Sequence, residues 1–328
     1  MEAFYHKYGP IWDNYEIGEL IGQGSFGNVW ELLSNGQSTG SVLKEVLVPP
    51  ESAGGGLVEA RLQGLDEKGA LLYYEGMKER ALEEVLLMRR LFKYDTFVKC
   101  LDYKVCKLNK DKDDFGWMLF ILMERLMPFK QKLIDEGITV SELYRLGADM
   151  CRALMALKNE GILHRDIKPE NIFYDTKTKS YKLGDFGISY YKGRETESKG
   201  QPGTLTYMSP EVYKGKGFSY EDDLYAAGML LYKLLNDNRI PFLSVYPAPY
   251  SPVERNQAMH RRFQGEEIPR ASIYAYAESE HHPSLIVREG ELQRACELER
   301  IVRRAIDANP NSRFGSVEEM YDEIVKAE

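Results

Sequence analysis

The first 124 residues carry short runs in which apolar and polar side chains alternate, a pattern typical of strands. The first run starts at Tyr15 and turns within the glycine-containing segment Gly22-Gln23-Gly24-Ser25-Phe26-Gly27, after which Val29-Trp30 resumes the extended pattern. Further strands are predicted at Ser41–Lys44, Phe97–Val105 and Trp117–Glu124. The polar segment between the last two predicts a turn.

Segments with the helical spacing of apolar residues interrupt these strands, and after Met127 such segments predominate. Within the first part, two helices are predicted, at Val58–Met77 and Ala81–Phe92. After Met127 the predicted helices are Phe129–Asp135, Ser141–Glu160, Asp223–Leu235, Gly290–Asn309 and Ser316–Glu328. Ser141 is the expected N-cap of its helix and Gly161 its stop. Residues 240–289 fit neither pattern.

This order predicts an α+β protein with a small, strand-rich lobe and a larger helical lobe. Their joint is expected near residues 124–129. No internal repeat is present.

Composition narrows the classes of function. With 328 residues, 43% of them hydrophobic, the chain is long enough to bury a core. A net charge of −8 disfavours nucleic acid or an anionic membrane surface as a partner, and only weakly favours basic protein substrates. The four cysteines have no C-x-x-C spacing, which predicts reduced thiols. The chain shows no signal pattern and no apolar run that could span a membrane, so we expect a cytoplasmic protein.

The glycine string has two physical interpretations. In a dinucleotide-binding fold a helix follows the glycines, and an acidic residue lies about twenty positions further on. Here the residues after Gly27 are strand-like, and the next notable side chain is Lys44. The string therefore predicts a strand-turn-strand flap over phosphates.

Two further strings carry the chemistry. Residues 164–171 read HRDIKPEN, and Asp185-Phe186-Gly187 follows. Asp166 can orient an attacking hydroxyl group, and Asn171 and Asp185 can hold magnesium against a triphosphate. Each string alone would be an ordinary turn or surface charge. Their order and spacing favour phosphoryl transfer.

Together these strings resemble the catalytic domain of protein serine/threonine kinases. The resemblance implies the bilobal protein-kinase fold over residues 15–328, after a leader at 1–14. The N-lobe is an antiparallel sheet with one main helix at 15–123, interrupted by a helical insertion at 49–80. The hinge is 124–129, and the mainly helical C-lobe is 130–328.

The resemblance also implies roles for individual residues. Gly22, Gly24 and Gly27 would contact the triphosphate. Lys44 would bind its α- and β-phosphates and pair with an acid, for which Glu83 and Glu84 both qualify. We choose Glu84 because Leu87, Met88 and Leu91 then face inward. The adenine pocket would be formed by residues that could equally be plain core: Val29, Val42, Met123, Glu124, Leu126 and Phe173.

In the larger lobe, the resemblance makes Asp166 the catalytic base and Lys168 the cation that neutralises the transferred phosphoryl group. Asn171 and Asp185 would bind Mg²⁺, which Mn²⁺ could replace, and Thr204 would bond near Asp166 and Lys168. Glu211 would pair with Arg313, as a buried anchor or as an ordinary surface pair. Asp223 and Gly228 match the helix that supports the catalytic loop.

Three features depart from the family pattern. Val42 and Ser209 stand where alanine is usual, and the spacing between Lys44 and Glu84 is longer than usual. A comparable insertion occurs in compact bacterial kinases of this type, which favours a bacterial origin. We expect residues 49–80 to pack beside the Glu84 helix and to bind a regulatory partner or a second copy. The alternative is that residues 49–80 are a solvent-exposed insertion with no effect on activity.

The expected substrates are proteins bearing Ser or Thr, because Lys168-Pro169-Glu170-Asn171 is the serine/threonine form of the motif. Arg165 is expected to receive a phosphate from Thr196 or Ser198, unless it pairs with Glu195 or Glu197. Two other functions are a pseudokinase scaffold and a kinase-like small-molecule phosphotransferase. The first usually lacks a catalytic residue, and the second lacks Lys168 and the segment Gly203–Glu211.

Overall fold

The computed structural model describes residues 12, 15–24, 27–49, 57–62, 64–108, 116–187, 190–191, 204–275 and 284–328. The chain forms two compact units, Met1–Arg125 and Leu126–Glu328. The boundary between them falls inside the range predicted for the joint. Among the described residues, no helix is both long and apolar enough to cross a membrane.

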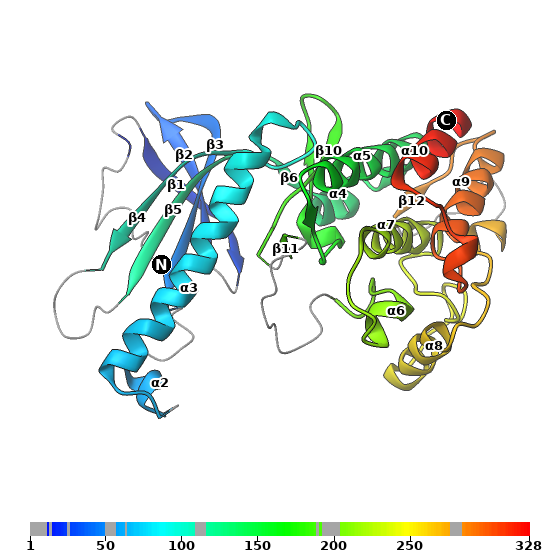
Figure 1. Ribbon diagram of the computed structural model, residues 1–328. Coiled ribbons are helices and arrows are strands. Elements are labelled where there is room, and N and C mark those ends of the chain that lie inside the picture. The colour runs from blue at the N-terminus through cyan, green and yellow to red at the C-terminus, as the bar shows by residue number, and fades with distance from the viewer. Residues whose placement is uncertain are drawn as a thin grey trace. The chain divides into compact units, whose positions relative to one another are not determined.

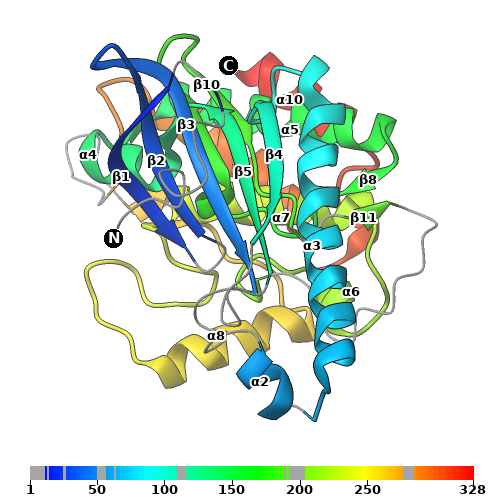
Figure 2. The same ribbon diagram turned by 90° about the vertical axis from the view of Figure 1, so that its left-hand side faces the viewer.

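Unit 1 is built on a five-stranded sheet. Its antiparallel neighbours follow the order β1-β2-β3-β5-β4, which can be traced in Figure 2. The strands are β1 (Glu16–Gly24), β2 (Gly27–Ser34), β3 (Gln37–Val48), β4 (Cys100–Lys107) and β5 (Trp117–Glu124).

The two faces of this sheet differ because side chains alternate along each strand. One face holds a core cluster made of Trp30, Leu32, Leu43, Leu108, Met118, Phe120 and Leu122. Trp12 packs against this cluster and donates a hydrogen bond to Asp102 over 2.8 Å, so part of the predicted leader is anchored to the sheet. The opposite face carries Lys44.

Two helices accompany the sheet, α2 (Leu57–Leu62) and α3 (Glu67–Arg90), followed by the short 3₁₀ turn η2 (Leu91–Lys93). Figure 1 shows α3 as one continuous rod with α2 at its first end. The prediction of two separate helices is therefore wrong for residues 67–90. No proline or capping residue divides this stretch, and Ala, Leu, Glu, Lys and Arg continue the helix through Gly76. Residues 67–80 of the insertion are thus the first part of the Glu84 helix.

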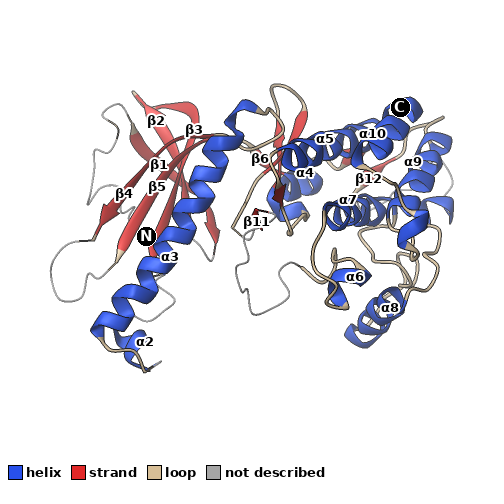
Figure 3. Cartoon of the chain, viewed as in Figure 1, coloured by secondary structure: helices blue, strands red, loops and turns tan. Residues whose placement is uncertain are grey.

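Unit 2 is mainly helical, as the colours of Figure 3 show. Its helices are α4 (Phe129–Asp135), α5 (Val140–Asn159), α6 (Pro210–Tyr213), α7 (Tyr220–Leu235), α8 (Pro252–Gln264), α9 (Leu292–Ala305) and α10 (Val317–Ala327), with 3₁₀ turns η3 (Pro169–Asn171), η4 (Ser272–Ala275) and η5 (Pro310–Ser312). Its short strands are β6 (Met127–Pro128), β7 (Ile138–Thr139), β8 (Ile162–Leu163), β9 (Ile172–Asp175), β10 (Ser180–Leu183), β11 (Tyr190–Tyr191) and β12 (Leu285–Ile286).

The start of α5 corrects one predicted cap. The N-cap is Thr139, not Ser141, because the Thr139 hydroxyl accepts a hydrogen bond from the Glu142 N–H while the Glu142 carboxylate accepts one from the Thr139 N–H. The end is as predicted: Gly161 follows the helix with a φ of 73°, a conformation that favours glycine.

Close packing of α7 on α9 requires a glycine. A Cβ atom at Gly228 would lie 2.9 Å from the side chains of both Ala305 and Ile306. Such an approach is too short for carbon atoms, so α7 can sit this close to α9 only with glycine at this point. Since α7 also carries Asp223, this packing fixes the helix that holds that carboxylate.

Candidate functional site

The glycine turn joins β1 to β2 in unit 1. Gly22 pairs with Val29 and Gly24 with Gly27, while residues 25 and 26 lie outside the described residues. A Cβ at Gly27 would lie 1.6 Å from the carbonyl oxygen of Glu45, and its φ is 141°. No other residue type fits this backbone. The turn is therefore a strand-turn-strand flap and not the start of a helix.

Lys44 lies on the sheet face opposite the core cluster. Its Nζ atom is 3.6 Å from Oε1 of Glu84, with the two side chains 21% and 18% exposed. Both therefore sit in a partly desolvated place, where the attraction between the charges is stronger than in water. Leu87, Met88 and Leu91 are buried, which explains why Glu84 and not Glu83 points to the sheet.

Three predicted adenine-pocket residues share this face with Lys44. Val29 lies directly opposite Lys44, and Val42 lies directly opposite Met123. Because directly opposed residues point to the same side of a sheet, the four side chains form one apolar strip with a cation in it. Glu124 ends β5, where its backbone N–H donates to the Lys99 carbonyl over 3.2 Å.

In unit 2, the loop from His164 to Asn171 is held by a buried carboxylate. The backbone N–H groups of His164 and Arg165 donate to Asp223 over 2.7 and 2.8 Å. Asp223 is only 2% exposed and comes from the first turn of α7. This bidentate contact fixes the backbone immediately before Asp166, where Arg165 has a φ of 70°.

The side chains of this loop converge on Asp166. Its carboxylate accepts hydrogen bonds from Thr204 Oγ1 over 3.0 Å and from Lys168 Nζ, and Asn171 Nδ2 donates to it over 3.2 Å. Asn171 Nδ2 also donates to the Asp166 carbonyl over 2.8 Å. The carboxylate is 13% exposed, so it is oriented on several sides and still reachable.

Asp185 lies close to Asn171 because the Gly184 N–H donates to the Asn171 carbonyl over 2.8 Å. The Asn171 amide uses its nitrogen on Asp166, so its side-chain oxygen is the atom left to bind a cation. Asp185 adds a partly exposed carboxylate with a left-handed φ of 60°. Oxygen donors of this kind suit a hard divalent cation.

A buried histidine packs beneath these residues. His164 contacts the Phe186 ring at 5.3 Å between centroids, and its Nε2 lies 3.2 Å from the Gly184 carbonyl. Its Nδ1 accepts a hydrogen bond from the Asp166 N–H over 3.3 Å. These contacts select the neutral tautomer with the proton on Nε2. Burial lowers the pKa of His164, which keeps the ring neutral.

This geometry agrees with the sequence comparisons. The family model described as protein kinase domain matches residues 70–324, most of the chain. The chain belongs to the protein kinase family. That membership confirms the predicted resemblance and fold class. The matched range begins after the glycine turn and Lys44.

Relatives of this kinase come from plants, bacteria and amoebae. The AtPK1/AtPK6 serine/threonine-protein kinase of Arabidopsis thaliana is 26% identical over 234 residues, 70% of this chain and 43% of that protein. A probable serine/threonine-protein kinase PknB of Corynebacterium glutamicum is 31% identical over 172 residues, 50% of this chain and 26% of that protein. A probable serine/threonine-protein kinase of Dictyostelium discoideum is 32% identical over 174 residues, 46% of this chain and 15% of that protein. The match covers less than half the length of each relative.

The remaining residues predicted for the adenine pocket, Leu126 and Phe173, lie in unit 2. Phe173 in β9 pairs with Pro128 of β6, which follows Leu126 by two positions. Thr196 and Ser198, the predicted phosphorylation sites, lie outside the described residues, as do Glu195 and Glu197.

Three sets of hydrogen bonds hold the segment that ends in Glu211. Arg313 donates to Glu211 over 2.9 and 3.3 Å and is 7% exposed, which is the buried form of the predicted pair. The Ser209 hydroxyl accepts from the Val212 N–H and donates to Asp222, so this departure from alanine supplies the N-cap of α6. Arg262 donates to the carbonyls of residues 205 and 206, both over 2.7 Å.

Sequence reasoning missed Arg262 because residues 240–289 were left unassigned. The helix that carries it, α8, begins at a capping box formed by Ser251 and Glu254 and ends at Gly265. The string Ser251-Pro252-Val253-Glu254 has the spacing of such a box, with proline at the first helical position. This signal was available in the sequence.

The buried, neutral His164 makes stability depend on pH. The unfolded chain gains a proton on this ring below pH ~6.5, whereas the folded chain resists it, so stability is present above that pH and lost as pH falls. Between pH 7 and 5, we expect the unfolding free energy of the wild type to fall more steeply than that of His164→Gln. The difference between the two slopes should reach up to about 1.4 kcal/mol per pH unit. Urea unfolding at several pH values measures this.

The control is His260→Gln, because His260 is exposed and meets water in both states. It should show the wild-type slope. An identical slope for wild type and His164→Gln would contradict the buried neutral ring.

Proposed function

We propose that this protein is an ATP- and Mg²⁺-dependent serine/threonine protein kinase. The observation that carries the proposal is the partly exposed Asp166 carboxylate, oriented by Thr204, Lys168 and Asn171. A carboxylate held in this way can receive the proton of a hydroxyl group and align its oxygen. The names of the relatives support Ser and Thr as acceptors.

The proposed ATP-binding residues are those that the family resemblance implies. Lys44, oriented by Glu84, would hold the α- and β-phosphates, and the backbone at Gly22, Gly24 and Gly27 would cover them. The adenine ring would contact the apolar side chains and backbone groups at Val29, Val42, Met123, Glu124, Leu126 and Phe173.

Asn171 and Asp185 would hold the divalent cation, for which Mg²⁺ is our proposal and Mn²⁺ a possible replacement in the assay. When bound, the cation neutralises charge that develops on the phosphates. The side-chain oxygens described above fit this task. The rest of the cation's coordination would come from phosphate oxygens and water, as is usual for Mg²⁺.

The proposed reaction is an in-line displacement. The hydroxyl oxygen of the acceptor forms a bond to the γ-phosphorus while the bond from that phosphorus to the β,γ-bridging oxygen breaks, and ADP leaves. The hydroxyl proton passes to Asp166. Lys168, which already contacts the Asp166 carboxylate, places its positive charge beside the transferred group.

Removing the carboxylate tests this role. In Asp166→Asn we expect turnover to fall by roughly 10²- to 10⁴-fold with nearly unchanged ATP affinity, because the amide cannot accept the proton. Transfer of labelled phosphate to a Ser- or Thr-containing protein measures turnover, and omission of Mg²⁺ tests the metal. Phosphotyrosine as the main product, or a fully active Asp166→Asn variant, would overturn the proposal.

We also propose that the kinase phosphorylates itself at Thr196 or Ser198. The support is Arg165, whose guanidinium lies beside the catalytic loop, 5.7 Å from the Phe218 ring centroid, and can form charge-assisted bonds to a phosphate. Mass spectrometry after the same ATP incubation locates the phosphates. Phosphate on this segment in the wild type and its absence in Asp166→Asn support the proposal, whereas an unmodified segment in both excludes it.

Residues 49–80 would provide a surface for a second copy of the chain. Leu62 and Leu72 are 79% and 74% exposed, and Tyr73 is 46% exposed. Acidic and basic side chains both occur along the first half of α3, so two identical segments can pair their charges in an antiparallel arrangement. Because α3 is continuous, a contact made there would act on Glu84 through one rigid helix.

Paired substitutions test this surface without shortening α3. Leu62→Ser with Leu72→Ser should abolish a concentration-dependent doubling of mass measured by analytical ultracentrifugation, because the apolar contact is lost. Ile134→Ser is the matched control, since Ile134 is also 79% exposed but lies in unit 2. A wild type that stays monomeric at all concentrations would exclude self-association.

A further inference from the structure

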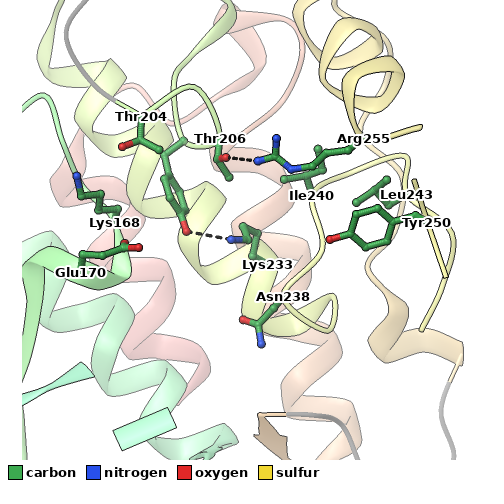
Figure 4. A pocket seen from close by; sticks show the side chains of 11 residues that line it. Lys168, Glu170, Thr204, Thr206, Lys233, Asn238, Ile240, Leu243, Tyr250 and Arg255 are labelled. Atoms are coloured by element: carbon green, nitrogen blue, oxygen red, sulfur yellow. Dashed lines mark hydrogen bonds between the residues drawn. The ribbon is translucent and has the colours of Figure 1, made fainter. Parts of the chain in front are cut away.

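A pocket of about 420 Å³ lies within unit 2, beside the catalytic loop. Figure 4 shows how its lining comes from five parts of the chain: the catalytic loop, the segment at 204–207, α7, the loop at 238–250 and α8. Lys168 and Thr204 line it, and both contact the Asp166 carboxylate. The pocket therefore opens next to the place where the acceptor hydroxyl would be.

The charged side chains of this pocket are not balanced. Glu170 forms an ion pair with Lys130 over 2.5 Å, and Lys168 contacts Asp166. Lys233 donates to the Tyr207 hydroxyl over 3.0 Å, and Arg255 donates to the Thr206 hydroxyl over 2.9 Å. In the part of the chain that the structure describes, neither Lys233 nor Arg255 forms an ion pair with a carboxylate. Two cations thus face the pocket with neutral partners only.

The Lys233 ammonium group lies in a partly desolvated place, where no carboxylate contacts it among the described residues. Burial lowers the pKa of this ammonium group to about 8; the Glu170 carboxylate acts in the opposite direction, and the positive charge of Arg255 lowers the pKa further. A half-buried ammonium group of this kind gains from a nearby anion, because the anion replaces lost hydration. The phenol rings of Tyr207 and Tyr250 and the side chain of Ile240 supply walls for the hydrocarbon part of a ligand.

We propose that this pocket binds an anionic side chain of the protein substrate, a carboxylate or a phosphorylated residue, close in sequence to the acceptor Ser or Thr. The proposal rests on the kinase activity proposed above and names the substrate class for it. The proposed preference for an anion concerns this pocket alone. The net charge of the whole chain, −8, would by itself favour basic substrates.

Peptides that contain one acceptor Ser test the proposal. Glu, phosphoserine, Gln or Lys is placed in turn at each of the positions flanking the acceptor, and kcat/KM is measured. At one position we expect the Glu or phosphoserine peptide to exceed the Gln peptide by roughly 10-fold and the Lys peptide by more. A higher value for phosphoserine than for Glu indicates a substrate that is already phosphorylated, and the reverse indicates an acidic one.

Charge variants tie this preference to the pocket. In Lys233→Gln, the ratio of kcat/KM for the Glu peptide to kcat/KM for the Gln peptide should fall toward one. In Lys233→Glu, kcat/KM should be higher for the Lys peptide than for the Glu peptide. Lys214→Glu is the control, because Lys214 is exposed at the end of α6 and does not line the pocket. A structural defect would lower kcat/KM for all peptides together and would leave the ratio unchanged.

Two results would overturn the proposal: equal wild-type rates for acidic, neutral and basic peptides, or an unchanged ratio in folded Lys233→Glu. The two proposals fail separately. Phosphate transfer without an acidic preference refutes the pocket and retains the kinase activity. Tight binding of acidic peptides in fluorescence anisotropy, lost in Lys233→Glu and without any phosphate transfer, retains the pocket and refutes the kinase activity.

Discussion

The buried carboxylate of Asp223 is the contact on which the catalytic loop depends. Two adjacent backbone N–H groups, those of His164 and Arg165, donate to its two oxygens, and His164 is fully buried. Burial raises the pKa of Asp223 to about 7, and the two N–H bonds act against this effect. With the carboxylate in place, Arg165 can hold its left-handed backbone and Asp166 follows in a fixed direction.

In unit 1, the corresponding constraint is the placement of Glu84. One helix, α3, carries both this acid and residues 67–80 of the insertion. The buried side chains that follow Glu84 fix the helix against the sheet. The first half of α3 therefore belongs to the same helix as the acid that contacts Lys44.

The sequence predicted most of what is local. Alternating apolar positions placed the strands of the sheet, and Gly161 placed the end of α5 correctly. The string at 164–171 contains Lys168 and Asn171, two of the residues that contact the Asp166 carboxylate, and the family resemblance implied the third, Thr204. The roles assigned to these residues remain proposals.

Other features were not predictable in the same way. The continuity of α3 depends on the absence of a break at Gly76, and helical periodicity alone does not distinguish one helix from two. The choice of Thr139 over Ser141 as N-cap depends on which hydroxyl meets Glu142. The pocket lined by Lys233, Arg255 and Tyr207 joins segments distant in sequence, and nothing in a linear pattern shows that the two cations form no ion pair with a carboxylate among the described residues.

Amide hydrogen exchange in Asp223→Asn tests most directly whether this carboxylate holds the site. An asparagine side chain offers one acceptor oxygen and leaves one buried N–H unpaired, at a cost of about 1–3 kcal/mol. At pH 8 the account predicts faster exchange at His164 and Arg165 and a fall in turnover, with wild-type values in Glu221→Gln, a change at an exposed position in the same helix. Unchanged exchange together with unchanged turnover in Asp223→Asn would contradict it.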